Sequence, residues 1–154
     1  PKSVHCNSVK HPTVPKLADA RSSIILNYEK EVRCCLSINH THDIDKHGTK
    51  HSHAYARVEG LEGAAYIKFG LLLNYPNGEP EEIEISTNGI EWTKVNDVGT
   101  WFPDAFVGTM SSLQRFAAGE DKVLLHSVDN AYETMAVVYA CLDSNKNPGT
   151  IVNY

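Results

Sequence analysis

The chain has 154 residues and a mass of 17.0 kDa, a size that fits one domain better than two. Hydrophobic residues make up 42% and charged residues 21%, an ordinary globular composition that excludes a disordered or collagen-like chain. The net charge of −5 argues against a nucleic acid or an anionic membrane as a partner, because both attract basic surfaces. No apolar run approaches the roughly 20 residues that cross a bilayer, so we expect no membrane span.

The start of the chain and its cysteines bear on its origin. The first residue is Pro1 and the two methionines are Met110 and Met135, so we expect a segment of a longer protein. The four cysteines form no C-x-x-C pair and have no regular spacing: Cys6, Cys34, Cys35 and Cys141. We interpret them as free thiols and expect a reducing, cytoplasmic location.

Short strand-like runs separated by turn residues occupy the chain up to about residue 100. Seven runs are predicted as strands: Ser3–Val9, Ser22–Asn27, Glu31–Ile38, His53–Glu59, Ala64–Phe69, Glu82–Ser86 and Ile90–Val95. Most connections are short, such as Gly60–Gly63 and Thr87–Gly89, which favours antiparallel pairing. Residues 39–53 are polar and are expected in a loop or at the end of a strand.

Two helical patterns follow the strands. The first starts after Pro103 and Asp104, which suit a first helical turn, and stops at Gly119. The second starts at Ser127, a good N-cap, and stops at residues 147–149. Each has an apolar face: Phe106, Met110, Leu113 and Phe116/Ala117 in the first, and Ala131, Met135, Val138 and Leu142 in the second. Residues 150–153 could add a closing strand.

These elements predict an α+β fold, with an open, mostly antiparallel sheet and the C-terminal helices packed on one face. The helices can cover one face of such a sheet but not both. We therefore expect the open face of the sheet to form a homo-oligomer interface.

A cluster of histidines raises the possibility of a metal site. His40 and His42 would share one face of a strand, as would His51 and His53, and imidazoles beside carboxylates can hold zinc or iron. No established metal signature accompanies them. We therefore expect no metal, with these four histidines as the alternative, and favour binding of a substrate by polar groups of this segment. No nucleophile elbow, phosphate loop or G-x-G-x-x-G is present.

Several segments, taken in order, resemble the glucose-fructose oxidoreductase / inositol dehydrogenase / rhizopine catabolism family (Gfo/Idh/MocA). Val58–Ala65 resembles its I-E-G-t-e-G turn, and Phe102–Phe106 resembles the segment that leads into its first C-terminal helix. His126–Met135 and Ala140–Ser144 are similar to the start and end of its last helical stretch. Pro1–Val4 resembles the point where its C-terminal sheet begins.

The resemblance implies that residues 1–154 are a single C-terminal domain, of the dihydrodipicolinate reductase-like type, from an NAD(P)-dependent oxidoreductase acting on a sugar, cyclitol or related polyol. The family's N-terminal Rossmann domain, its E-K-P lysine and its D-x-x-x-H histidine have no counterpart in this sequence. Hydride transfer needs a cofactor domain. We therefore expect this chain to hold no catalytic residue and no cofactor, to be inactive alone, and to have its own Rossmann domain as a partner.

The roles that the resemblance implies for this domain are substrate binding and formation of the oligomer interface. We expect the substrate site to be lined by polar groups and an aromatic wall, which suit hydroxyl-rich ligands. The expected lining residues are Lys50, His51, His53, Trp101 and Asp104. Two alternatives stay open. The chain could be a free-standing binding or oligomerisation module, or a small metal-binding protein that uses its histidine cluster.

Overall fold

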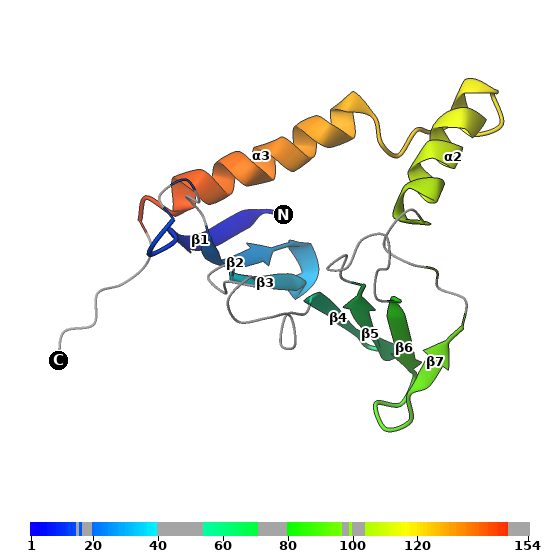
Figure 1. Cartoon of the computed structure of the whole chain (residues 1–154), viewed down its shortest axis with the longest axis horizontal. Coiled ribbons are helices and arrows are strands. Elements are labelled where there is room, and N and C mark those ends of the chain that lie inside the picture. Colours follow the sequence, from blue (N-terminus) through cyan, green and yellow to red (C-terminus); the bar gives the residue numbers. More distant parts are fainter. Residues whose placement is uncertain are drawn as a thin grey trace. The chain divides into compact units, whose positions relative to one another are not determined.

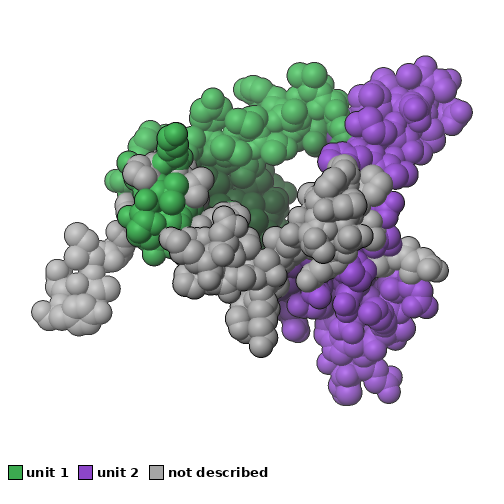
Figure 2. Space-filling model, in the orientation of Figure 1, with its two compact units in different colours: residues 1–47, 126–154 green, residues 48–125 purple. Residues whose placement is uncertain are grey.

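The computed structural model describes residues 1–14, 16, 20–39, 54–70, 80–96, 99 and 104–147. The chain divides into two compact units (Figure 2). Unit 1 combines Pro1–His47 with His126–Tyr154, and unit 2 is Gly48–Leu125. Unit 1 therefore brings together segments from both ends of the sequence.

Unit 1 contains a three-stranded antiparallel sheet, sheet A, in the order β1-β2-β3 (Figure 1). Its strands are β1 (Ser3–Val9), β2 (Arg21–Asn27) and β3 (Arg33–Asn39), with a short 3-10 turn, η1 (Glu29–Glu31), between β2 and β3. The register pairs Cys6 with Ile24 and Ile24 with Leu36. The predicted hairpin around residues 28–30 is confirmed.

The two faces of sheet A differ in polarity, because alternate residues of a strand point to opposite faces. One face carries Val4, Cys6, Ile24, Leu26, Cys34, Leu36 and Ile38, together with Ser8 and Ser22. The other carries mainly Ser, His, Asn and Arg, with Ile25 among them. In the apolar run Ile24–Leu26, Ile24 and Leu26 belong to the apolar face and Ile25 to the polar one.

Helix α3 (Val128–Ser144) lies along β1 (Figure 1). Ser127 caps its start, since its Oγ accepts a hydrogen bond from the backbone N–H of Asn130 at 3.2 Å. At its other end, Ser144 Oγ accepts from Cys6 N at 2.9 Å and Asn145 Oδ1 accepts from Ser8 N at 2.6 Å. These bonds satisfy amides on the free edge of β1, which a bare edge would leave open to pairing with another chain.

Unit 2 contains a four-stranded antiparallel sheet, sheet B, in the order β4-β5-β6-β7. Its strands are β4 (Ala54–Gly60), β5 (Gly63–Phe69), β6 (Glu82–Ser86) and β7 (Thr93–Val95). The β4–β5 turn is tight, and Gly60 pairs with Gly63 across it. A Cβ at Gly63 would collide with the carbonyl oxygen of Ser86, so glycine is required there by the close approach of two backbones.

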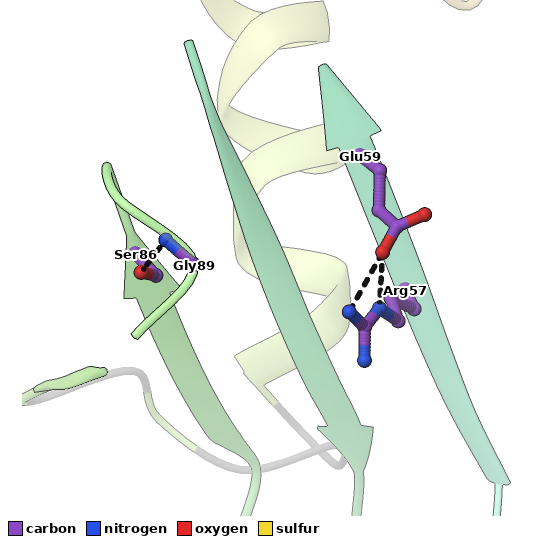
Figure 3. A network of polar contacts seen from close by, with 4 residues as sticks. All are labelled: Arg57, Glu59, Ser86 and Gly89. Atoms are coloured by element: carbon purple, nitrogen blue, oxygen red, sulfur yellow. Dashed lines mark hydrogen bonds and ion pairs between the residues drawn. The ribbon is translucent and has the colours of Figure 1, made fainter. Parts of the chain in front are cut away.

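Strand β7 starts later than the predicted Ile90–Val95 run because the side chain of Asn88 holds the preceding residues in a turn. The Oδ1 atom of Asn88 accepts hydrogen bonds from Ile90 N and Glu91 N, both at 2.9 Å. Ser86 Oγ accepts from Gly89 N, also at 2.9 Å (Figure 3). An Asn side chain that replaces backbone partners in this way ends a ladder.

The helical segment of unit 2 begins at Asp104, close to the start predicted from Pro103 and Asp104. A 3-10 turn, η2 (Asp104–Phe106), leads into α2 (Val107–Ala117). Gly119 follows with φ of +78°, the left-handed conformation typical of a residue just after a helix. No helix in the described part of the chain is long and apolar enough to cross a membrane.

The predicted α+β class, with antiparallel strands and two C-terminal helices, is confirmed. The described strands divide between two sheets where one was expected. Both sheets are thinly covered. Among the described residues, the buried apolar side chains are Cys6 and Ala20, while many large apolar side chains remain exposed.

Candidate functional site

Most of the residues predicted to line a substrate lie outside the described part of the chain. These are Lys50, His51, His53 and Trp101, and the alternative metal ligands His40 and His42 lie outside it as well. Within the described residues, no group of three His, Cys, Asp or Glu side chains is placed to hold a metal ion. The assignments to these positions therefore stay predictions.

Asp104 is the one predicted substrate-lining residue whose position is described. It is exposed and opens the 3-10 turn before α2. A Cβ placed on Gly99 would lie 3.1 Å from Asp104 Oδ2, so the carboxylate lies close against the backbone of Gly99. Gly99 has φ of +81°, a conformation that favours glycine.

Unit 1 has a cleft of about 590 Å³ between the start of β1 and residues 130–140 of α3. Its apolar walls include Val4, Val137 and Ala140. Its polar groups include Lys2, Tyr28, Asn130, Glu133 and Thr134. The volume falls in the range of small-molecule sites, which combine an apolar lining with a few polar groups.

Some polar groups of the cleft already have partners. Lys2 Nζ lies 2.8 Å from Glu29 Oε1, and Thr134 Oγ1 donates a hydrogen bond to Asn130 O at 3.0 Å. Because the Lys2 and Glu29 side chains are exposed, solvent and salt screen this ion pair. The cleft can therefore present an ammonium group and the Glu133 carboxylate to a hydroxyl-bearing ligand.

One face of sheet B is a second polar surface. Arg57 binds Glu59 Oε1 through Nε at 2.8 Å and Nη2 at 2.7 Å (Figure 3). The guanidinium carbon of Arg57 also lies 5.7 Å from the centre of the Trp92 ring, within the range of a cation–π contact.

Aromatic rings and ion pairs continue this face across neighbouring strands. The rings of Tyr55 and Tyr66 stack with centroids 5.9 Å apart. Lys68 and Lys94 both approach Glu82, at 3.8 and 3.3 Å. Rings beside carboxylate, ammonium and guanidinium groups offer the contacts that a hydroxyl-rich ligand uses.

The opposite face of sheet B is apolar. The register aligns Val58 with Ala65 and Ile85, and Ala56 with Ile67 and Ile83. Val58, Phe69 and Ile85 remain exposed on this face. Exposed apolar faces of this kind are typical of interaction surfaces.

A pair of thiols lies where β1 meets α3. Cys6 is buried, Cys141 is half-buried, and both are free. Burial raises the pKa of the Cys141 thiol, and the neighbouring Cys6 raises it further. A raised pKa keeps more of a thiol protonated at neutral pH, which lowers its reactivity as a nucleophile.

Comparison with known proteins gives one informative likeness. No protein-family model matches the chain, and no curated protein matches it. A solved structure described as "putative oxidoreductase from Thermotoga maritima" is similar over 96% of this chain, with a TM-score of 0.66 and 13% sequence identity. The match spans 39% of that chain, so this protein covers less than half the length of its structural neighbour. At this identity the likeness shows the fold alone.

Two features of these surfaces were absent from the sequence prediction. The cleft joins residues 1–4 to residues 130–140, and no local pattern signals such a long-range contact. The polar face of sheet B could be predicted in part, because the run His53–Glu59 alternates large polar or aromatic residues with small apolar ones. Its partners Tyr66, Lys68 and Glu82 required the register of three strands.

Proposed function

We propose that this chain is the C-terminal domain of an NAD(P)-dependent oxidoreductase that acts on a sugar, a cyclitol or a related polyol. The observation that carries the proposal is the fold shared with part of a larger protein described as an oxidoreductase. The family resemblance of Val58–Ala65, Phe102–Phe106 and His126–Met135 supports it from the sequence. In this proposal NAD(P) binds to an N-terminal Rossmann domain, which is the partner of this chain.

The domain supplies walls of the substrate site and a surface for assembly. Lys50, His51, His53, Trp101 and Asp104 are the proposed substrate-lining residues, and the polar face of sheet B extends the same chemistry along β4. The apolar face of sheet B fits the expected homo-oligomer interface. The four free thiols support a reducing, cytoplasmic location.

The test uses the full-length protein that the gene encodes and the 154-residue chain side by side. We expect the full-length protein to reduce NAD⁺ or NADP⁺ with at least one member of a panel of sugars and cyclitols, followed by the absorbance of the reduced nicotinamide. The 154-residue chain should show no turnover. Tight binding of NAD(P) to the 154-residue chain in calorimetry, or a full-length protein inert toward the whole panel, would overturn the proposal.

Substrate-lining residues are tested by their effect on KM. His53→Ala and Asp104→Asn in the full-length enzyme should raise KM for the polyol or lower kcat, because each removes a hydrogen-bonding group from the site. Lys122→Ala is the matched control, since Lys122 is an exposed residue beyond α2. Unchanged kinetics in both substrate-site variants would remove these residues from the site.

A further inference from the structure

Two thiols from opposite ends of the sequence meet inside unit 1. Cys6 lies on β1 and Cys141 lies on α3, and the two side chains are close enough to share a hydrogen bond. Cys6 is only 6% exposed, whereas Cys141 is half-buried, and both are free. Because β1 and α3 belong to the same unit, this proximity depends on contacts within that unit alone.

Hydrogen bonds near the thiols hold the two backbones together. Cys6 N donates to Ser144 Oγ at 2.9 Å, and Ser8 N donates to Asn145 Oδ1 at 2.6 Å. Asn145 N in turn donates to the carbonyl oxygen of Cys141 at 2.9 Å. Cys141 precedes Ser144 by three residues, so both side chains lie on the side of α3 that faces β1. This is the close approach of two backbones that a disulfide requires.

The other two thiols are placed less well for a disulfide. Cys34 and Cys35 are adjacent on β3, and adjacent residues of a strand point to opposite faces of the sheet. Strand β2 lies between β3 and β1, so these two strands are about 10 Å apart, beyond the reach of about 7 Å between the Cα atoms of a disulfide. Cys6 and Cys141 are therefore the pair that the fold brings together.

We propose that Cys6 and Cys141 form a modification site, at which a low-molecular-weight disulfide such as oxidised glutathione introduces a reversible disulfide between β1 and α3. The more accessible Cys141 thiolate attacks one sulfur of the oxidant, and a glutathione thiolate leaves with the electron pair of the broken S–S bond. The Cys6 thiolate then attacks the Cys141 sulfur and displaces the second glutathione. The two protein thiols lose two protons and two electrons, and two molecules of reduced glutathione are formed.

The surroundings of the thiols make this reaction slow and selective. Attack requires a thiolate, and burial raises the pKa of Cys141, so the thiols stay protonated while the glutathione pool is reduced. Cys34 and Cys35 are exposed and react faster, but without a partner thiol at hand they stop at the mixed disulfide. The fold therefore separates a fast reaction on β3 from a slow one that links β1 to α3.

The disulfide would tie together segments from both ends of the sequence. A cross-link between distant residues stabilises a fold by restricting the unfolded chain, so oxidation should raise the melting temperature by about 5 °C or more. The same two elements form walls of the cleft at Val4 and Ala140. Oxidation would therefore also fix these walls relative to each other. The inference goes beyond the proposed enzymatic function and does not depend on it, because the disulfide needs neither substrate nor nicotinamide.

The test equilibrates the folded 154-residue chain in glutathione buffers that range from fully reduced to fully oxidised. Mass spectrometry of unreduced peptides should find Cys6 joined to Cys141 in the oxidised buffers. The melting temperature should rise with that link by about 5 °C or more, and dithiothreitol should reverse both changes. The same result is expected after Cys34→Ser and Cys35→Ser, which remove the exposed thiols. Adding Cys141→Ser to that chain is the matched control and should abolish both the link and the shift.

Single variants test the order of attack. Cys6→Ser should accumulate glutathione on Cys141, because the second thiol is gone, whereas Cys141→Ser should leave the buried Cys6 unmodified. Circular dichroism identifies a variant that fails to fold, and the parent chain decides the question without any substitution. Three results for the parent chain would refute the site: a Cys6 thiol that stays free in the fully oxidised buffer, a link that forms only in urea, or a link that lowers the melting temperature.

Discussion

Sheet A and sheet B are both antiparallel, and most of their strands have seven residues, yet they are held together by different means. In sheet A, the edge strand β1 is closed by side chains from residues 144 and 145, so both ends of the sequence must meet. In sheet B, each strand pairs with the next along the chain, and ion pairs such as Lys94–Glu82 link neighbouring strands. Strands pair successively along the chain in both sheets, and sheet A differs in that a long-range contact with the end of α3 closes its edge.

The comparison predicts that the stability of sheet B is most sensitive to substitutions where two of its strand backbones approach each other closely. Gly63→Val should destabilise the chain by about 2–3 kcal/mol, because the new side chain collides with the carbonyl of Ser86. Urea unfolding monitored by circular dichroism measures the loss. Gly108→Ala in α2 is the control, since a Cβ there meets nothing within 4 Å, and alanine favours helix. A neutral Gly63→Val would contradict the close approach.

The stability of sheet A should be most sensitive to substitutions at the end of α3, which closes the edge of β1. Asn145→Ala should cost about 1–2 kcal/mol, because the N–H of Ser8 loses its acceptor. Ser144→Ala removes the partner of Cys6 N in the same way. Hydrogen exchange should speed up at Cys6 and Ser8 and stay unchanged in β5. Equal acceleration in both sheets would mean that the two are not held separately.

The reactivity of the thiols distinguishes the covered part of sheet A from its open part. Cys34 and Cys35 on β3 are exposed and should react quickly with iodoacetamide, whereas buried Cys6 should react slowly. The pKa of Cys141 is raised in the folded chain, chiefly by burial, so its alkylation should increase at higher pH than that of the exposed thiols.

The same pKa shift has a consequence for stability. Because the folded chain holds the proton of Cys141 more tightly than the unfolded chain, this contribution is present below the ordinary thiol pKa. It is lost as the pH rises through the folded pKa. Peptide mapping by mass spectrometry checks the order of reaction, and a Cys141→Ser chain should lose less stability at alkaline pH than the parent.

The smallest effect is expected on the polar face of sheet B. Lys94→Met removes one of two lysines that approach Glu82, and the Lys68 ammonium remains. Exposed ion pairs contribute little, so the free energy of unfolding should fall by about 0.5 kcal/mol or less. Thermal unfolding at low and high salt measures the change. A loss comparable to that of Asn145→Ala would contradict the contrast between the two sheets.

The sequence by itself determined the order and type of the described elements of this protein and several of their boundaries. Ser127 begins α3 because its hydroxyl caps the helix, and Gly119 follows α2 because glycine tolerates a positive φ. Alternation identified β4 with its two different faces. These signals are local, since each depends on residues a few positions apart. The boundary missed at β7 also had a local cause, the side chain of Asn88, which accepts two backbone hydrogen bonds.

Only the tertiary structure decided how these elements meet. It divided the strands between two sheets, joined β1 to the end of α3, and placed the cleft between residues 1–4 and 130–140. On α3 it placed Val137, Cys141 and Ser144 against β1, and left Met135, Val138 and Leu142 of the face identified by the periodicity exposed. A repeat fixes which side chains share a face of a helix. The direction of that face depends on contacts between residues far apart in the chain, and these leave no local pattern.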